Sequence, residues 1–414
     1  MAMQTSTAVP PERRRWVPAH LRWPVGYAIA AAGIFLIFYY RNLLDPGFMG
    51  FMDRWLPLST INAMVLWVVF ALGLNIVVGY AGLLDLGYVA FWAIGGYTAG
   101  WLMSTFFDQW HVFVLGSERP ELHGIHVSFW FVMIAAAAVC ALCGVIIGAP
   151  TLRLRSDYLA LVTLGFGEII PQFIRNGDRV GTLNFTNGAR GISPVDRIQA
   201  GTLRLGPFDL AYKYVIFVVL AALMMFISLR LRHGKIGRAW LAIREDEVAA
   251  SAMGVPLMRT KLLAYGIGAM AGGIGGVAFA THVNAVFPDR FDFSISITLL
   301  AMVVLGGMGN VWGVTLGALI VAWVNAIGLD QGGQAFNSVF GTNINFPSWN
   351  YLFFGGALVL MMLFRREGFI PEARTRLVLR EAERTTVSGI GDIEVTELEE
   401  QAAATRIDSV GERL

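Results

Sequence analysis

RAWLAIREDEVAASAMGVPLMRTK, residues 238–261, is a basic, helix-prone segment that lies between two long apolar regions of the chain. Its positive charges are Arg238, Arg244, Arg259 and Lys261. Segments rich in Lys and Arg stay on the cytoplasmic side of membrane proteins. The segment therefore predicts a short charged helix on the cytoplasmic face of a membrane protein. Membrane spans are expected both before and after it in the sequence.

The middle of this segment follows an E-x-A-A-x-x-x-G pattern that ends at Pro256. Small residues let the surface of another protein approach closely, and glycine followed by proline ends a helix. We therefore predict a docking helix for a partner protein, within a cytoplasmic segment that covers residues 230–261. The residues assigned to this contact are Arg244, Glu245, Asp246, Glu247, Ala249, Ala250 and Gly254.

The composition is that of a membrane protein. Hydrophobic residues make up 56% of the chain, charged residues only 14%, and the mean hydropathy is +0.60. Ordinary soluble domains carry about 25% charged residues, so a soluble globular protein is excluded. The 47 glycines suit transmembrane helices that pack closely against one another.

Apolar runs near the length of a membrane span divide the chain. Shorter runs count as well, because broken helices occur inside membrane proteins. We predict an all-α polytopic bundle of about ten spans with both termini in the cytoplasm, between a basic N-terminal segment (1–24) and a polar C-terminal tail (365–414), with the membrane domain at 25–364. The predicted spans are 25–40, 57–78, 83–103, 128–148, 158–174, 212–229, 262–280, 294–306, 311–328 and 349–364.

Charges in the loops agree with this topology. Alternation from a cytoplasmic N-terminus places three basic regions inside, at Arg153 and Arg155, at 230–261, and at Arg365 and Arg366. The first span resembles a signal peptide, but no small-residue cleavage site follows it, so we predict that it is retained. The loops expected outside are 106–127, 331–347 and 176–210, of which the last carries both Arg and Asp; long loops determine topology only weakly.

Polar residues within the predicted spans are candidates for a substrate pathway, because ionisable groups inside a membrane are costly and usually functional. Glu168 lies one turn before Pro171, which predicts a kinked helix that carries a carboxylate. Such a carboxylate serves either as part of a gate or as a structural tie through an ion pair or hydrogen bond. Asp85 either lines the pathway or caps the start of the third span. The pathway candidates are Asn75, Asp85, Tyr88, Thr163 and Glu168.

Glycines at four-residue spacing indicate where helix backbones touch. Three such strings are present, and they predict helix packing rather than chemistry. Their members are Gly96, Gly100, Gly268, Gly272, Gly276, Gly309, Gly313 and Gly317.

Catalytic and cofactor motifs are not visible in the sequence. The pair Cys140 and Cys143 lies in an apolar run, which favours packing over redox or metal chemistry. The loop histidines His111, His123 and His126 are expected to be solvated rather than metal-bound. No phosphate-binding G-x-x-x-x-G-K-[ST] motif occurs, so the chain is not expected to bind ATP itself. We expect neither an enzyme nor a nucleic-acid-binding protein.

Five stretches, taken in order, resemble the LivM-type permease of branched-chain amino-acid ABC importers. The resemblance covers residues 62–371. The stretches are GLNIVVGYAGLLDLGYVAFWAIGGYTAG (73–100), TLRLRSDYLALVTLGFGEII (151–170), NGARGIS (187–193), GRAWLAIREDEVAASAMGV (237–255) and VVLGGMGNVWG (303–313).

The resemblance implies a helical fold of the type II importer kind in the bacterial inner membrane. It also implies uptake of leucine, isoleucine or valine. The implied partners are a second, LivH-type permease, two ATPase subunits that bind ATP, and a periplasmic substrate-binding protein. The E-x-A-A-x-x-x-G match implies that the docking helix couples to an ATPase. Many relatives read S-L-G-H where this chain has Asp85-Leu86-Gly87-Tyr88, a departure that bears on the role of those residues.

Two other classes of function compete with this interpretation, and within the importer class a different substrate stays open. Related permeases carry urea or short-chain amides. An ion-coupled secondary transporter needs several carboxylates near unwound helices, for which only Asp85 and Glu168 qualify. A membrane enzyme or an assembly scaffold needs a catalytic cluster or a docking domain, and the sequence shows neither.

Overall fold

The computed structural model describes residues 22–109, 111–114, 123–153, 156–178, 184–200, 203–206, 209–365 and 368–370. Within these ranges the chain is built of helices, and its strands are two to four residues long. The predicted all-α fold is thus confirmed. Most of the predicted segments 1–24 and 365–414 lies outside the described residues, as do Arg155 and Arg366.

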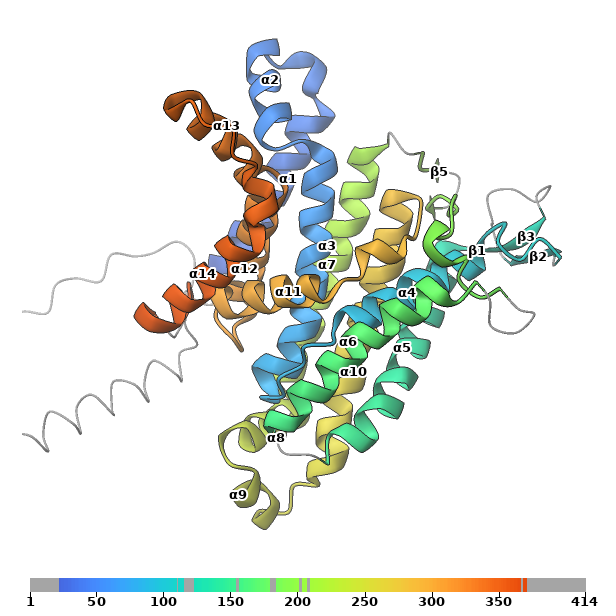
Figure 1. Cartoon of the computed structure of the whole chain (residues 1–414), viewed down its shortest axis with the longest axis vertical. Coiled ribbons are helices and arrows are strands. Elements are labelled where there is room, and N and C mark those ends of the chain that lie inside the picture. The colour runs from blue at the N-terminus through green and yellow to red at the C-terminus, as the bar shows by residue number, and fades with distance from the viewer. Residues whose placement is uncertain are drawn as a thin grey trace, which may run out of the picture.

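Each predicted span coincides with a helix (Figure 1). The helices are α1 (Arg22–Tyr39), α2 (Pro46–Trp55), α3 (Leu58–Leu74), the π-helix η3 (Asn75–Tyr80), α4 (Val89–Leu102), α5 (Phe129–Thr151), α6 (Ser156–Asn176), α7 (Leu210–His233), α8 (Lys235–Glu245), α9 (Glu247–Ala252), α10 (Leu257–Val283), α11 (Phe293–Gly306), α12 (Val311–Trp323), the π-helix η6 (Val324–Gly328), α13 (Leu329–Phe340) and α14 (Asn350–Phe364).

Six helices in the described part of the chain are long and apolar enough to cross a membrane by length and composition, and a shorter apolar helix covers Trp23–Tyr39. By contrast, α4 and α11 have 14 residues each. At 1.5 Å per residue such a helix is about 21 Å long, less than the ~30 Å of the hydrocarbon layer. The number of crossings and the side on which the termini lie therefore remain predictions.

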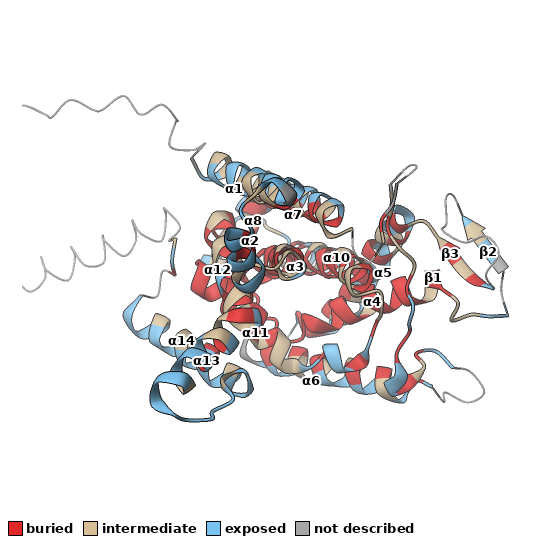
Figure 2. Cartoon of the chain, turned by 90° about the horizontal axis from the view of Figure 1, so that it is seen from above, coloured by how far each residue is buried: buried red, intermediate tan, exposed pale blue. Residues whose placement is uncertain are grey.

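The core lies along α10, which packs against α3, α4 and α5 (Figure 2). In the span formed by α3 and η3, 89% of the apolar window is buried, against 6% in the span that contains α14. The outer helices α1 and α14 therefore turn most of their surface away from the protein, as expected for helices at the rim of a membrane bundle.

Glycines allow α10 to approach its neighbours at backbone distance. A β-carbon on Gly276 would lie 2.6 Å from the Trp92 carbonyl oxygen of α4. One on Gly272 would meet Phe91, and one on Gly268 would collide with Val77. Gly96 lies opposite Gly276 across the same contact.

The other predicted packing glycines serve further contacts. Gly100 accommodates Ile192 from the loop before α7, while Gly313 and Gly317 of α12 lie against the Gly306 backbone of α11. Gly309 instead lies in the turn before α12, with φ +86°.

Short strands and loops form a cap at the end of the bundle away from α8 and α9 (Figure 1). β3 (Gly124–Val127) pairs antiparallel with β1 (Met103–Ser104) and parallel with β2 (His111–Val114), and β4 (Gln199–Ala200) pairs with β5 (Leu203–Arg204). His126, expected in solvent, is instead fully buried, with its Nδ1 2.7 Å from the Asp196 Oδ2. The described residues contain no group of three or more His, Cys, Asp or Glu arranged to hold a metal.

Substitution of Gly276 by alanine tests whether backbone contact holds the core. The added methyl group should destabilise the folded protein by roughly 1–3 kcal/mol, because rigid backbone cannot move away from it. Gly355→Ala in α14 is the matched control, since a β-carbon there has nothing within 4 Å. Thermal unfolding in detergent should show a lower midpoint for Gly276→Ala only; equal midpoints would contradict the packing interpretation.

Candidate functional site

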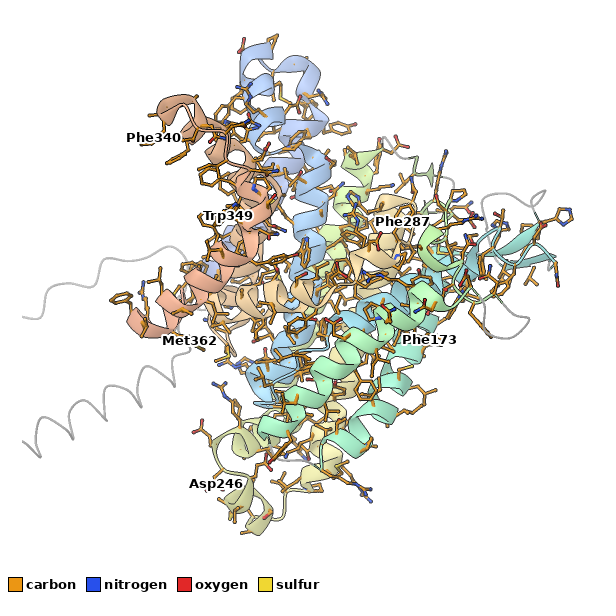
Figure 3. The ribbon with its side chains drawn as sticks, viewed as in Figure 1. Phe173, Asp246, Phe287, Phe340, Trp349 and Met362 are labelled. Carbon is orange, nitrogen blue, oxygen red and sulfur yellow. The ribbon has the colours of Figure 1, made fainter. Side chains whose placement is uncertain are left out.

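The basic segment folds as two short helices joined at Asp246, not as one (Figure 3). The Asp246 carboxylate accepts hydrogen bonds from the backbone N–H groups of Val248 (2.7 Å) and Ala249 (3.0 Å), so it caps α9. Gly254 ends α9 with φ +83°, and the Val255 N–H bonds to the Ala250 carbonyl. These are the features of a Schellman motif, in which a left-handed glycine closes the helix.

The α9 tip projects beyond the rest of the bundle (Figure 1), and two apolar side chains at this tip are exposed. Val248 is 78% exposed and Met253 is 84% exposed. Glu245, Asp246, Ala249 and Gly254 are also exposed, whereas Ala250 is buried. Ala250 thus packs within the chain, and Val248 and Met253 form an exposed apolar tip that the pattern of small residues did not predict.

Interactions with the membrane helices hold α8 and α9 in place. The Lys261 ammonium of α10 lies 2.6 Å from the Glu247 carboxylate. The Trp240 indole N–H donates to the Thr260 carbonyl at 2.8 Å, and its ring stacks on Tyr80. Trp240 is completely buried, so the helices are docked rigidly against the bundle.

Arg244 joins α8 to the end of α3. Its guanidinium donates a hydrogen bond to the Gly79 carbonyl, in the π-helix that extends α3. At the other end of the same π-helix, the Asn75 Oδ1 accepts from the Gly309 N–H at 2.9 Å. A chain of direct contacts therefore runs from the docking helices through η3 to the turn between α11 and α12.

The turn between η3 and α4 gathers most of the predicted pathway residues. The Asp85 Oδ1 accepts from the Gly87 N–H at 2.9 Å, and its Oδ2 has no hydrogen-bond partner among the described residues. It does not cap α4, because Tyr88 is the residue before that helix. Thr163 of α6 accepts from the Leu86 N–H at 3.1 Å.

Tyr88 completes this group, since its hydroxyl donates to the Gly268 carbonyl at 2.9 Å. Asn75, Asp85, Tyr88 and Thr163 are each at most 1% exposed. Tyr88 and Thr163 connect the turn before α4 to α3, α6 and α10, whereas Asn75 is bonded to Gly309 instead. Glu168 is separate from them and lies exposed on the outside of α6.

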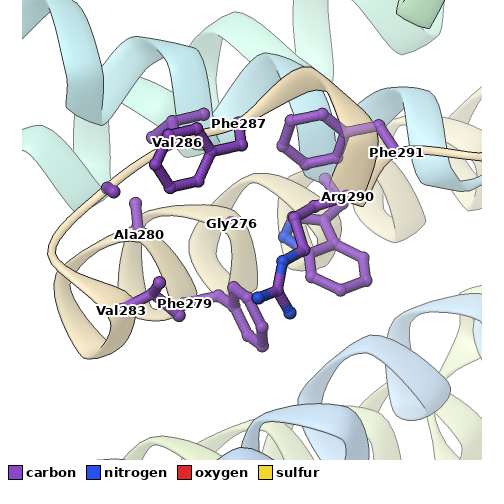
Figure 4. Close-up of a pocket in the computed structure, with 11 residues that line it drawn as sticks. Gly276, Phe279, Ala280, Val283, Val286, Phe287, Arg290 and Phe291 are labelled. Atoms are coloured by element: carbon purple, nitrogen blue, oxygen red, sulfur yellow. The ribbon is translucent and has the colours of Figure 1, made fainter. Parts of the chain in front are cut away.

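The cavities among the described residues are mainly apolar. One has a volume of about 890 Å³ and lies between α1, α3, α7 and α12. A small one of about 10 Å³, near the size of one water molecule, lies between α4, the end of α10 and the Phe287–Phe291 turn, with Arg290 at its edge (Figure 4). Neither holds the convergent polar groups that a site for a polar ligand needs.

Comparison with known proteins agrees with this arrangement. Residues 56–362 match the family described as the permease component of the branched-chain amino acid transport system. The chain belongs to this family of permeases. It is 34% identical over 337 residues to the high-affinity branched-chain amino acid transport system permease protein LivM of Escherichia coli, covering 76% of this chain and 70% of that protein.

Two more distant relatives show the breadth of the similarity. A probable branched-chain amino acid transport permease protein LivM of Methanocaldococcus jannaschii is 27% identical, covering 77% of this chain and 95% of the relative. The fructose import permease protein FrcC of Rhizobium meliloti is 27% identical, covering 55% of this chain and 60% of the relative. No solved structure matches the permease. Membership of the family makes the permease a multi-pass membrane protein and one component of a transport system.

Asp246→Ala tests the cap that shapes the docking tip. Loss of two hydrogen bonds at the start of α9 should lower its local stability by ~1 kcal/mol. Amide hydrogen exchange across α9 should then become roughly five-fold faster. Glu245→Ala is the control, because Glu245 is an exposed neighbour outside the cap; equal exchange in both variants would show that Asp246 does not stabilise α9.

Proposed function

We propose that this permease is the membrane subunit of an ATP-binding-cassette importer that moves branched-chain amino acids into the cytoplasm. The observation that carries the proposal is the exposed α8–α9 protrusion. It is capped at both ends of α9 and tied to the membrane helices through Glu247, Trp240 and Arg244. A rigid protrusion with an apolar tip suits a motor that pushes from outside the membrane.

The proposed assembly contains a second permease, two ATPase subunits and a periplasmic substrate-binding protein, in the bacterial inner membrane. ATP binds to the ATPases, not to the permease, consistent with the missing phosphate-binding motif. The Val248 and Met253 side chains enter a groove of the ATPase, where burial of apolar surface stabilises the contact. The charged groups around them set its orientation.

Movement of the ATPases reaches the membrane through two contacts. The Glu247–Lys261 ion pair transmits motion to the start of α10, and the Arg244 hydrogen bond to Gly79 transmits it to η3. The Asn75 hydrogen bond then carries it to the turn before α12. Because these elements are joined by short direct contacts, they move with the docking helices and switch the permease between inward- and outward-facing states.

The proposed substrate is a zwitterion with an apolar side chain. Two LivM relatives named for branched-chain amino acids cover more of this chain than the fructose permease does. The binding protein selects the substrate before it reaches the membrane, so the permease needs little recognition of its own. The sparse polar groups of the bundle suit such a solute.

The double substitution Val248→Arg and Met253→Arg tests docking. Two charges at the tip should prevent its burial in the ATPase groove. ATP-driven uptake of labelled leucine by the reconstituted importer should fall at least ten-fold, while membrane insertion of the permease is unchanged. Val339→Arg with Phe340→Arg on α13 is the matched control, because these side chains are also exposed, at 76% and 64%, but far from the tip.

Full leucine uptake by the tip variant would contradict the coupling role. Parallel assays with labelled urea and fructose test the substrate, and uptake of either in place of leucine would replace the proposed solute while leaving the coupling result intact.

A further inference from the structure

The exposed face of α6 differs from that of the other outer helices. On α5 and α7 the exposed residues within the span are apolar, such as Ile134, Leu142, Val219 and Leu223. On α6 the exposed face includes Glu168 and Gln172. These two residues are four positions apart, so they lie on one side of the helix.

Glu168 lies deep within the span. It follows Ser156, the first residue of α6, by twelve positions, which is about 18 Å along the helix axis. Since α6 has 21 residues, Glu168 lies near the middle of this helix and of the predicted span 158–174. The nearest cation along the helix, Arg175, is bound to Asp292 (2.7 Å) and Asp289 (3.5 Å), a further two turns away.

The opposite face of α6 is fixed against the bundle. Thr163 is fully buried, and a β-carbon on Gly167 would lie 3.1 Å from the Gly87 Cα. Backbone contact of this kind prevents the helix from rotating Glu168 inward. Within the described part of the chain, the Glu168 carboxylate has no hydrogen bond or ion pair.

In the predicted span 158–174 a carboxylate that faced lipid would be unfavourable, because such groups face a bundle interior or water instead. We propose that the outer face of α6 lines a water-filled conduit shared with the second permease, and that Glu168 binds the α-ammonium group of the amino acid in transit. This inference rests on the proposed function and adds a binding site to it. The Gln172 amide N–H groups donate to the substrate carboxylate.

The surroundings of Glu168 suit an apolar side chain. Leu161 is 66% exposed and Ile169 is 60% exposed on the same face. Gly165, between Leu161 and Glu168, has nothing within 4 Å of the position of a β-carbon. The face therefore offers a carboxylate and an amide beside a gap bordered by two branched apolar residues, which matches a zwitterion with a branched side chain.

Cysteine labelling tests whether water reaches the outer face of α6. In a Cys140→Ala, Cys143→Ala background, single cysteines replace Glu168, Gln172 or, as a control, the lipid-facing Leu223 of α7. A charged thiol reagent reacts only with cysteines that water reaches, and it is applied to the assembled importer with and without ATP. We expect modification at 168 and 172 in at least one state and none at 223. Absence of modification at 168 and 172 in both states would overturn the conduit assignment.

Charge substitution decides whether Glu168 binds the ammonium. Glu168→Gln should lower the maximal rate of leucine uptake about ten-fold, because a charge-assisted hydrogen bond is lost. The KM should not change, since the binding protein captures the substrate. Glu168→Asp, which keeps the charge, should retain most of the rate. Basal ATPase activity and thermal stability should equal those of the wild type in both variants.

An unchanged maximal rate in Glu168→Gln would overturn the ammonium site. A maximal uptake rate that falls together with thermal stability or basal ATPase activity would assign Glu168 a structural role. That result would overturn the ammonium site as well. A wild-type importer that does not carry leucine would instead refute the proposed substrate, and the labelling experiment would still decide whether α6 lines the conduit.

Discussion

The hydrogen bond from Arg244 to the Gly79 carbonyl is the interaction on which the attachment of α8 to the end of α3 depends. A helix that widens into a π-turn inside a membrane leaves backbone groups without their regular partners, and no water is available to satisfy them. Here Arg244, from outside the membrane domain, supplies a donor for the π-helix η3. The irregular end of α3 and the docking helices therefore stabilise each other.

Glycine contacts determine how motion spreads from this point. Backbone contacts between α10 and its neighbours leave no flexible side chains between the helices, so displacement of one helix displaces the next. The same property explains why the polar group around Asp85, Tyr88 and Thr163 is so well buried. Under the proposed coupling, the bundle moves as a set of rigid elements, to which α8 and α9 are joined through α10 and η3.

The sequence predicted the helical fold, the helical character of residues 238–261 and the glycine that ends α9, because capping residues and hydrophobic length act locally. It did not predict the break at Asp246, the π-helix at Asn75 or the burial of His126. Each of these depends on a partner far away in the sequence, such as Gly309 for Asn75 and Asp196 for His126. Glu168 was found as an ionisable residue in a span, but its exposure followed only from the side on which α6 packs. Spacing within one segment carries no record of such partners.

The departure at Asp85 and Tyr88 finds a structural explanation in these contacts. Tyr88 donates a hydrogen bond to the Gly268 carbonyl, so it fastens the start of α4 to α10. Asp85 accepts from the Gly87 N–H within the same turn, and both side chains are buried. Loss of either side chain leaves a buried backbone group without its hydrogen-bond partner, which lowers the stability of the fold. The departure at these two positions therefore concerns how the turn before α4 is held in place.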